Sequence, residues 1–236
     1  MKYQQRMKRL VERKIQQTRE KLSALGARDE DDYGLVLPPE GFVPELPVRD
    51  ENGSFAGAYA WGKNFRYLME NHPVYIDPDD ALAGRWMFML SRMRLGYKLY
   101  RSNFAFDYSD LVPLQEKYDI TSGIGKDAHF APDYGIGLSL GWGGLLDKAR
   151  ASLEKFGGDP VAKELFEAEI DAIEGIQCWI RHLALAARDR SMTEDEPERK
   201  RNLVEMAQLC SRLGSEPPET LREACQWIAI FNMASP

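Results

Sequence analysis

The sequence has few cysteines and no paired ones. Its three cysteines, Cys178, Cys210 and Cys225, are odd in number and lie far apart along the chain. This spacing argues against a disulfide framework or a zinc site, both of which need paired or closely spaced ligands. Free cysteine is among the residues most often buried in proteins. We therefore expect all three to be reduced core residues on the apolar faces of helices.

Long apolar runs and an excess of positive charge are also missing. No stretch of about 18 apolar residues could span a bilayer, and the N-terminus is charged from Lys2 through Arg19. We expect neither a membrane helix nor a secretory signal, and a cytoplasmic location. The net charge of −6 is spread over both signs and creates no positive field for a polyanion, so no nucleic-acid partner is expected.

Apolar spacing of three and four residues runs through most of the chain and predicts helices. In the first segment it joins Met7, Leu10, Val11, Ile15, Thr18 and Leu22. Prolines and glycines then break the pattern from residue 26 to residue 57, which indicates a wrapping loop. We divide the chain into residues 1–58, an N-terminal helix with this loop, and residues 59–236, a mostly helical unit.

The second unit predicts a series of helices with few or no strands. They cover residues 59–71, a short piece ending at 118, residues 134–156, a long helix after Asp159-Pro160, one from Pro197 to Gly214, and a last one after Pro218. The long helix should bury Val161, Leu165, Ile173, Ile176, Ile180, Leu183 and Ala187. The last should bury Leu221, Ala224, Cys225 and Ile228, and its apolar end at 227–233 should stay exposed for a partner.

Two features of these helices need a special explanation. Five glycines between residues 135 and 144 each cost about 1 kcal/mol of helix propensity, so close packing must hold this helix. Glu167, Asp171 and Glu174 fall on one face of the long helix, as in di-iron bundles. No Glu-x-x-His pair occurs in the sequence, so a solvated acidic face is the preferred interpretation and a carboxylate-bridged metal protein a third hypothesis.

The stretch from Gly123 to Tyr134 combines the residues best suited to chemistry. Its glycines let the backbone approach a ligand closely, and His129 can exchange a proton near neutral pH. Asp133 stands where it would cap the helix that begins at Tyr134. The stretch is a candidate site without a complete mechanism.

Three stretches, in this order, resemble the N-terminal helical region of the glycyl radical enzymes of the pyruvate formate-lyase type, in particular the dehydratase and lyase branches. They are residues 61–84, the segment Gly125 to Tyr134 with Leu138 beyond it, and residues 199–210 followed by 221–227. The second is similar to a G-H-x-x-x-D-Y-x-x-x-L segment, although Lys126-Asp127-Ala128 separates Gly125 from His129. The resemblance implies a mostly α chain that forms the helical part of an α/β barrel.

The resemblance also implies a chemistry. In this family a radical-SAM activase installs a glycyl radical near the C-terminus, and a mid-chain cysteine becomes a thiyl radical. Neither the cysteine loop nor the radical glycine loop occurs in this sequence. We therefore expect no catalytic residue, no bound cofactor and no turnover from this chain alone. His129 matches the histidine that hydrogen-bonds a substrate hydroxyl in diol-dehydratase-like members, or it only supports the turn.

The resulting expectation is an N-terminal fragment of a glycyl radical lyase or dehydratase that acts on a small hydroxylated substrate. It would supply one wall of the pocket and need the barrel portion or a partner chain, with homo-oligomerisation left open. The alternative is a non-catalytic binding or assembly module that docks a partner through its apolar C-terminal end.

Overall fold

The computed structural model describes residues 3–25, 36–40, 42, 45–51, 53, 55–85, 112–118 and 131–234. Within these ranges the chain is helical, and the only strand-like residue is a single bridge at Phe55. The helices are α1 (Tyr3–Leu25), α2 (Gly57–Asn71), α4 (Val112–Lys117), α5 (Tyr134–Phe156), α6 (Pro160–Thr193), α7 (Pro197–Leu213) and α8 (Leu221–Ala234). The predicted fold class is confirmed, and so are the positions of the predicted helices.

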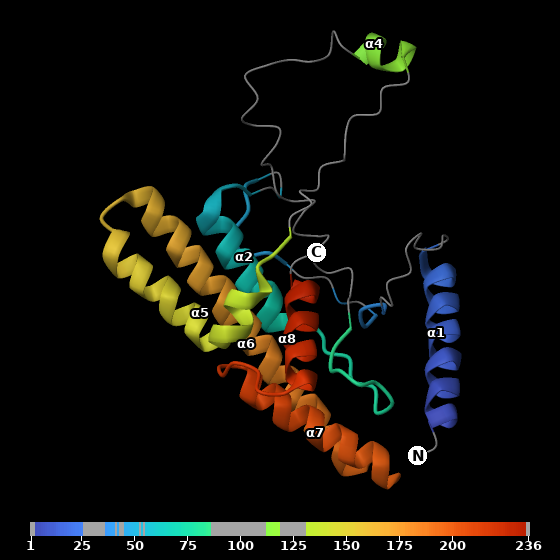
Figure 1. Ribbon diagram of the computed structural model, residues 1–236. Helices are drawn as coiled ribbons and strands as arrows, with labels where there is room; N and C mark the ends of the chain where they lie inside the picture. The colour runs from blue at the N-terminus through green and yellow to red at the C-terminus, as the bar shows by residue number, and fades with distance from the viewer. Residues whose placement is uncertain are drawn as a thin grey trace.

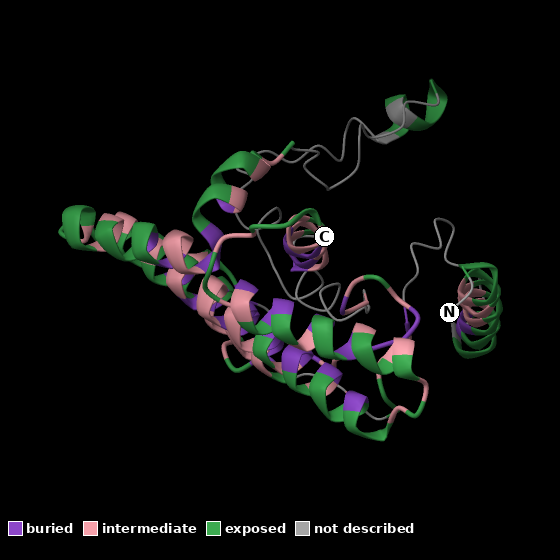
Figure 2. Cartoon of the chain, turned by 60° about the horizontal axis from the view of Figure 1, so that its bottom comes forward, coloured by how far each residue is buried: buried purple, intermediate pink, exposed green. Residues whose placement is uncertain are grey.

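Helix α6 is the centre of the molecule. Helices α2, α5 and α7 all pack along it, and α8 contacts both α5 and α7 (Figure 1). The buried residues gather where these helices meet (Figure 2). The core therefore lies around the second half of α6, with Trp179, Ile180 and Leu183 almost fully enclosed.

The start of α6 follows from its sequence. The Asp159 carboxylate accepts hydrogen bonds from the backbone N–H groups of Val161 and Ala162, and Pro160 occupies the first turn, where its missing N–H costs nothing. The predicted buried face was wrong at this end, because Val161 is 78% exposed and Leu165 is also exposed. In the first turns of α6 these two side chains therefore lie on the solvent-facing side of the helix.

The glycine-rich start of α5 is held by packing, as the sequence predicted. A Cβ added at Gly137 would lie 2.0 Å from the Trp227 ring of α8. Gly141 has φ 64°, where side chains are strained, and it kinks the helix beside the backbone of Glu216. The N–H of Gly143 donates to the carbonyl of Ser215 at 2.8 Å. Glycine is thus required where α5 meets the loop between α7 and α8.

The predicted buried face of α8 was wrong by part of a turn. Leu221 is 83% exposed and Cys225 is exposed, whereas Gln226, Trp227, Ile230 and Ala234 are buried. The Trp227 ring stacks on Trp142 of α5 at a centroid distance of 4.9 Å, and this contact sets the rotation of α8. The apolar end of the chain, expected to be exposed, instead buries much of its surface in the core. Of the three cysteines, only Cys210 is a fully buried core residue.

Helix α1 stands apart from the other helices (Figure 1). Its apolar residues Met7, Val11, Ile15 and Leu22 are exposed, while Gln17 and Lys21 are buried. The orientation opposes the usual rule for an amphipathic helix. The physical reason is that arginines on the opposite face of α1 bind an acidic turn in the loop that follows α2.

Candidate functional site

The acidic turn Asp77-Pro78-Asp79-Asp80 is the most densely bonded polar region of the described chain. It follows α2, helices α1 and α7 reach it, and α8 bonds to the loop residues directly after it. The side chains of Asp77 and Asp79 are each only 1% exposed. Isolated charges would be very unfavourable at that burial, so the partners of these carboxylates decide what the turn can do.

Asp79 lies between two guanidinium groups from distant parts of the chain. Arg9 of α1 binds both of its carboxylate oxygens, at 2.7 and 2.8 Å, and Arg199 of α7 also reaches both, the closer contact being 2.8 Å. Burial opposes ionisation of Asp79, but the hydrogen bonds from Arg9 and Arg199 outweigh it and lower the pKa of this carboxyl to about 2. Asp79 is therefore a permanent anion that joins α1 to α7.

Asp77 binds within the turn and to α1. Its Oδ1 accepts the backbone N–H of Asp79 at 2.9 Å, and its Oδ2 lies 2.7 Å from Arg13 Nη1. The Tyr75 hydroxyl also donates to Oδ2 at 3.3 Å and accepts from Gln17 of α1 at 3.0 Å. The third acid, Asp80, is paired with Arg85 at 2.7 and 2.8 Å, although burial still raises the pKa of Asp80.

Side chains from α7 and α8 bind the backbone of the same loop. The Asn202 amide donates to the carbonyls of Pro78 and Asp80, at 2.9 and 2.8 Å. Gln226, fully buried on α8, accepts from the N–H of Ala83 at 2.7 Å and donates to its carbonyl at 2.9 Å. All three acids of the turn are occupied by arginines, so the arrangement suits a rigid junction and not proton transfer or metal binding.

The sequence analysis missed this junction, although signals for it were present. Gln226 is a polar residue in the middle of an otherwise apolar helical segment, which indicates a buried hydrogen-bonding role. The acids 77, 79 and 80 and the basic run 199–201 were both visible in the sequence. Their pairing depends on bringing together segments about 120 residues apart, which local patterns do not report.

The predicted acidic face of α6 was wrong in its second half. Asp171 is buried and binds Lys63 at 2.7 Å and Arg66 at 3.0 Å, both from α2. Glu174 binds Arg66 as well, and Arg150 of α5 at 2.9 Å. These acids cross-link α2, α5 and α6 through ion pairs; Asp171 is buried and Glu174 is partly exposed.

The same contacts remove the support for a carboxylate-bridged metal site, because cations of the protein already neutralise Asp171 and Glu174. No group of three or more metal-binding side chains occurs in the described ranges. Among those ranges there is also no helix that is both long and apolar enough to cross a bilayer.

The only sequence-predicted site residue, His129, lies outside the described residues, as does most of the stretch from Gly123 onward. The end of that stretch is described. The Asp133 carboxylate accepts the N–H of Gly135 at 2.9 Å, which confirms the predicted cap of α5. The Tyr134 hydroxyl donates to Asn232 of α8 at 2.7 Å. The chain that follows His129 is therefore fixed against α8.

Of the two described histidines, His72 has a structural role. His72 is buried with its ring edge against Trp179, and its Nδ1 lies 2.7 Å from the carbonyl of Pro73. Burial lowers the pKa of His72 to about 4, so this ring is neutral near pH 7. His182 lies half-buried on α6, beside Cys178.

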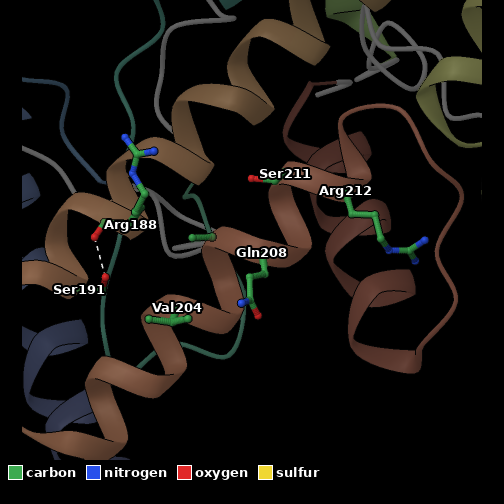
Figure 3. Close-up of a pocket in the computed structure, with 7 residues that line it drawn as sticks. Arg188, Ser191, Val204, Gln208, Ser211 and Arg212 are labelled. Carbon is green, nitrogen blue, oxygen red and sulfur yellow. Dashed lines mark hydrogen bonds between the residues drawn. The ribbon is translucent and has the colours of Figure 1, made fainter.

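A groove of about 590 Å³ runs between α6 and α7 (Figure 3). Val204 and Ala207 are among the residues that line it, and Arg188 and Arg212 stand near its two ends, pointing away from one another. Arg212 is bound to Glu223 through two nitrogens, at 2.7 and 2.8 Å. Its buried polar residue Ser191 donates to the carbonyl of Arg188, and among the described residues no buried side-chain polar atom that lacks a hydrogen-bond partner lines the groove.

Comparison with known proteins shows which family this chain is similar to. A family model described as Pyruvate formate lyase-like matches residues 119–235. The (2S)-3-sulfopropanediol dehydratase of Klebsiella oxytoca is 32% identical over 111 residues, which cover 45% of this chain and 13% of that protein. The isethionate sulfite-lyase of Desulfovibrio desulfuricans is 25% identical over 210 residues, 82% of this chain and 23% of that protein. The chain thus spans less than a quarter of the length of these two relatives.

Solved structures show the same fold. The glycerol-bound B12-independent glycerol dehydratase from Clostridium butyricum matches 76% of this chain with 30% of its own, at a TM-score of 0.55 and 18% identity. A structure of 1,2-propanediol dehydration in Roseburia inulinivorans matches 75% of this chain with 28% of its own, at a TM-score of 0.58 and 16% identity. The helical arrangement around α6 is therefore similar to part of these larger enzymes.

Proposed function

We propose that this chain is the N-terminal helical part of a glycyl radical dehydratase or lyase, because residues 119–235 match the Pyruvate formate lyase-like family model and the similar proteins include a dehydratase and a sulfite-lyase. In this proposal it forms one wall of the pocket for a small hydroxylated substrate. Polypeptide outside this sequence supplies the rest of the barrel, as a continuation or as a partner chain. His129 is the residue of this chain that meets the substrate.

The observation that carries the proposal is the way the segment after His129 is anchored. Asp133 caps α5, Tyr134 bonds to Asn232, and the close contact of Gly137 with Trp227 locks α5 onto α8. A residue that orients a substrate needs such a rigid support, because small displacements of a binding group lower the rate strongly. The family match covers this segment and its supports together.

The relatives indicate the substrate class. The names of the similar proteins include sulfopropanediol, glycerol and 1,2-propanediol, all of which carry hydroxyl groups. An imidazole can donate a hydrogen bond to a hydroxyl or hold it in one orientation. We therefore place a substrate hydroxyl opposite His129, with the exact compound decided by residues beyond this chain.

The described residues do not fit the radical machinery itself. The family's thiyl cysteine lies in a loop, whereas Cys178, Cys210 and Cys225 all lie within helices α6, α7 and α8. Burial further raises the pKa of Cys210 to about 12. No radical step is assigned to this chain, and the radical glycine and the reacting cysteine belong to the polypeptide that completes the enzyme.

A chimeric enzyme tests the proposal. The segment of the Desulfovibrio isethionate sulfite-lyase that aligns with this chain is replaced by the corresponding residues of this chain, which include His129. The chimera is activated anaerobically and followed by electron paramagnetic resonance and by sulfite release. We expect a glycyl radical and measurable turnover, and we expect none from the 236-residue chain alone.

His129→Ala in the chimera separates the two parts of the proposal, with His182→Ala as the matched control. Loss of one substrate contact should lower kcat/KM by roughly tenfold or more while the radical signal stays unchanged. Unchanged kcat/KM would remove His129 from the pocket. A soluble chimera that takes up no radical would contradict the assignment of the whole chain.

The second candidate was a binding module that docks a partner through its C-terminal end. It depended on the expectation that the apolar end at 227–233 is exposed. Trp227, Ile230 and Ala234 are buried within the chain itself. We do not propose it further.

A further inference from the structure

We propose that Cys178, with His182 as its base, is a site at which this chain forms mixed disulfides with small-molecule disulfides. The proposal is independent of the proposed function, since neither residue takes part in it. It rests on the distance between the two side chains and on their partial exposure. It also rests on the different surroundings of the other two cysteines, of which Cys210 is buried and Cys225 has no described histidine beside it.

The pair is built by the helix. Cys178 and His182 are four residues apart on α6, a spacing that brings side chains to the same face one turn apart. Cys178 Sγ lies 3.7 Å from His182 Nε2, within the reach of a hydrogen bond that involves sulfur. A nucleophile beside a base that can take its proton is the arrangement that activates thiols.

Both side chains are half-buried, in contrast to the deeply enclosed residues next to them. Trp179 and Ile180 follow Cys178 directly and are almost fully buried on other faces of α6, so this turn of the helix is firmly held. A small disulfide can therefore approach Cys178, while the backbone that carries it stays fixed.

The other cysteines lack one of the two requirements. Cys210 is fully buried, and burial raises the pKa of its thiol to about 12, which suppresses the thiolate. Cys225 is exposed on α8. Neither of the described histidines can serve it, because His72 is buried against Trp179 and His182 faces Cys178. Only Cys178 combines access with a neighbouring base among the described residues.

The reaction balances without a further oxidant. Cys178 Sγ attacks one sulfur of the disulfide R–S–S–R, and a new S–S bond forms as the old one breaks. The thiol proton passes to His182 Nε2 and then to the departing sulfur, which leaves as R–SH. The protein sulfur is oxidised and the leaving sulfur is reduced, and an added thiol reverses the step.

The test follows mixed-disulfide formation at each cysteine of the complete 236-residue chain. The protein is mixed with glutathione disulfide at pH 7, quenched with acid at intervals, digested and analysed by mass spectrometry. We expect Cys178 to be modified roughly tenfold or more faster than Cys225, which asks for less than the roughly hundredfold or more that a positioned base typically supplies. Cys210 should remain unmodified in the folded chain.

Two variants keep the proposal falsifiable. His182→Gln should reduce the rate at Cys178 to that of Cys225 and leave the rate at Cys225 unchanged. His182→Ala reports whether any smaller side chain raises the rate by improving access. In strong denaturant the three cysteines of the parent chain should react at similar rates, which shows that the folded arrangement creates the difference.

Faster modification at Cys225 than at Cys178 would overturn the proposal. So would a rate at Cys178 that is the same in the His182→Gln variant and in the parent chain. Circular dichroism of each variant confirms that a lost rate does not reflect unfolding of α6.

Discussion

Asp79→Asn is the sharpest test of how the chain is held together. The substitution keeps the shape of the side chain but removes the negative charge that Arg9 and Arg199 share. The Asp79 side chain is 1% exposed, so water cannot replace the lost interaction. A carboxyl whose pKa falls from about 4 in the unfolded chain to the value of about 2 in the folded chain contributes about 2 to 3 kcal/mol to folding at pH 7.

The sign of the pH dependence follows from the same shift. The pKa of Asp79 is lower in the folded chain than in the unfolded chain, so its contribution is complete above about pH 5 and is lost as the pH falls through 4 towards 2. The difference in unfolding free energy between the parent chain and Asp79→Asn should be largest at pH 7. At pH 3 the difference should be about half as large, because Asp79 is then mostly protonated in the unfolded chain but still mostly ionised in the folded chain.

Urea unfolding at pH 7, 5, 4 and 3 measures this difference. The control is Asp189→Asn, because Asp189 is 67% exposed and only loosely paired with Arg188, and its substitution should change stability little. Limited proteolysis adds a local readout, since α1 is held to the acidic turn through Arg9 and should be cut more readily in Asp79→Asn. An equal loss at pH 3 and pH 7, or a loss no larger than that of the control, would refute the reasoning.

Two further predictions concern packing and a buried histidine. Gly137→Ala should destabilise the chain by about 1 to 3 kcal/mol, because the new methyl group would overlap the Trp227 ring. Gly158→Ala is the control, since a methyl group there would have no neighbour within 4 Å and should not destabilise the chain. Chemical denaturation of both variants measures the difference. His72 should make the chain less stable as the pH falls from 6.5 to 4, since its pKa is lower in the folded than in the unfolded chain. His72→Gln should remove that part of the pH dependence of the unfolding free energy, and an unchanged profile would show that His72 charges freely.

The sequence predicted the existence of the helices correctly, but it predicted their buried faces only in part. The second half of α6 buries the expected residues, whereas α1, α8 and the first turns of α6 do not. The helices themselves were readable, because caps such as Asp159-Pro160 and glycines at the ends act locally. The rotation of α8 was not, since a segment rich in apolar residues on several sides offers more than one plausible face. The stacking of Trp227 on Trp142 of α5 selects one of them, and that contact joins residues far apart in sequence.

Charge pairing was equally invisible before the fold was known. Arg9, Asp79 and Arg199 are ordinary surface-type residues in the sequence, and the interpretation of Asp171 as part of a solvated face followed the common behaviour of acids on helices. Only the approach of α2 to α6, and of α1 and α7 to the acidic turn, made these carboxylates buried partners of arginine.

By itself the sequence determined the helical class, the positions of the helices, the need for close packing around the glycines of α5, and a family resemblance that the comparisons confirmed. All of these depend on local propensity or on ordered motifs. The tertiary structure alone decided which face of α1 and of α8 is buried and which charges meet. Those choices arise from competition among long-range contacts, where burying a tryptophan or neutralising a carboxylate outweighs the local apolar pattern. The same competition sets the orientation of α1, whose arginines and not its apolar residues face the rest of the chain.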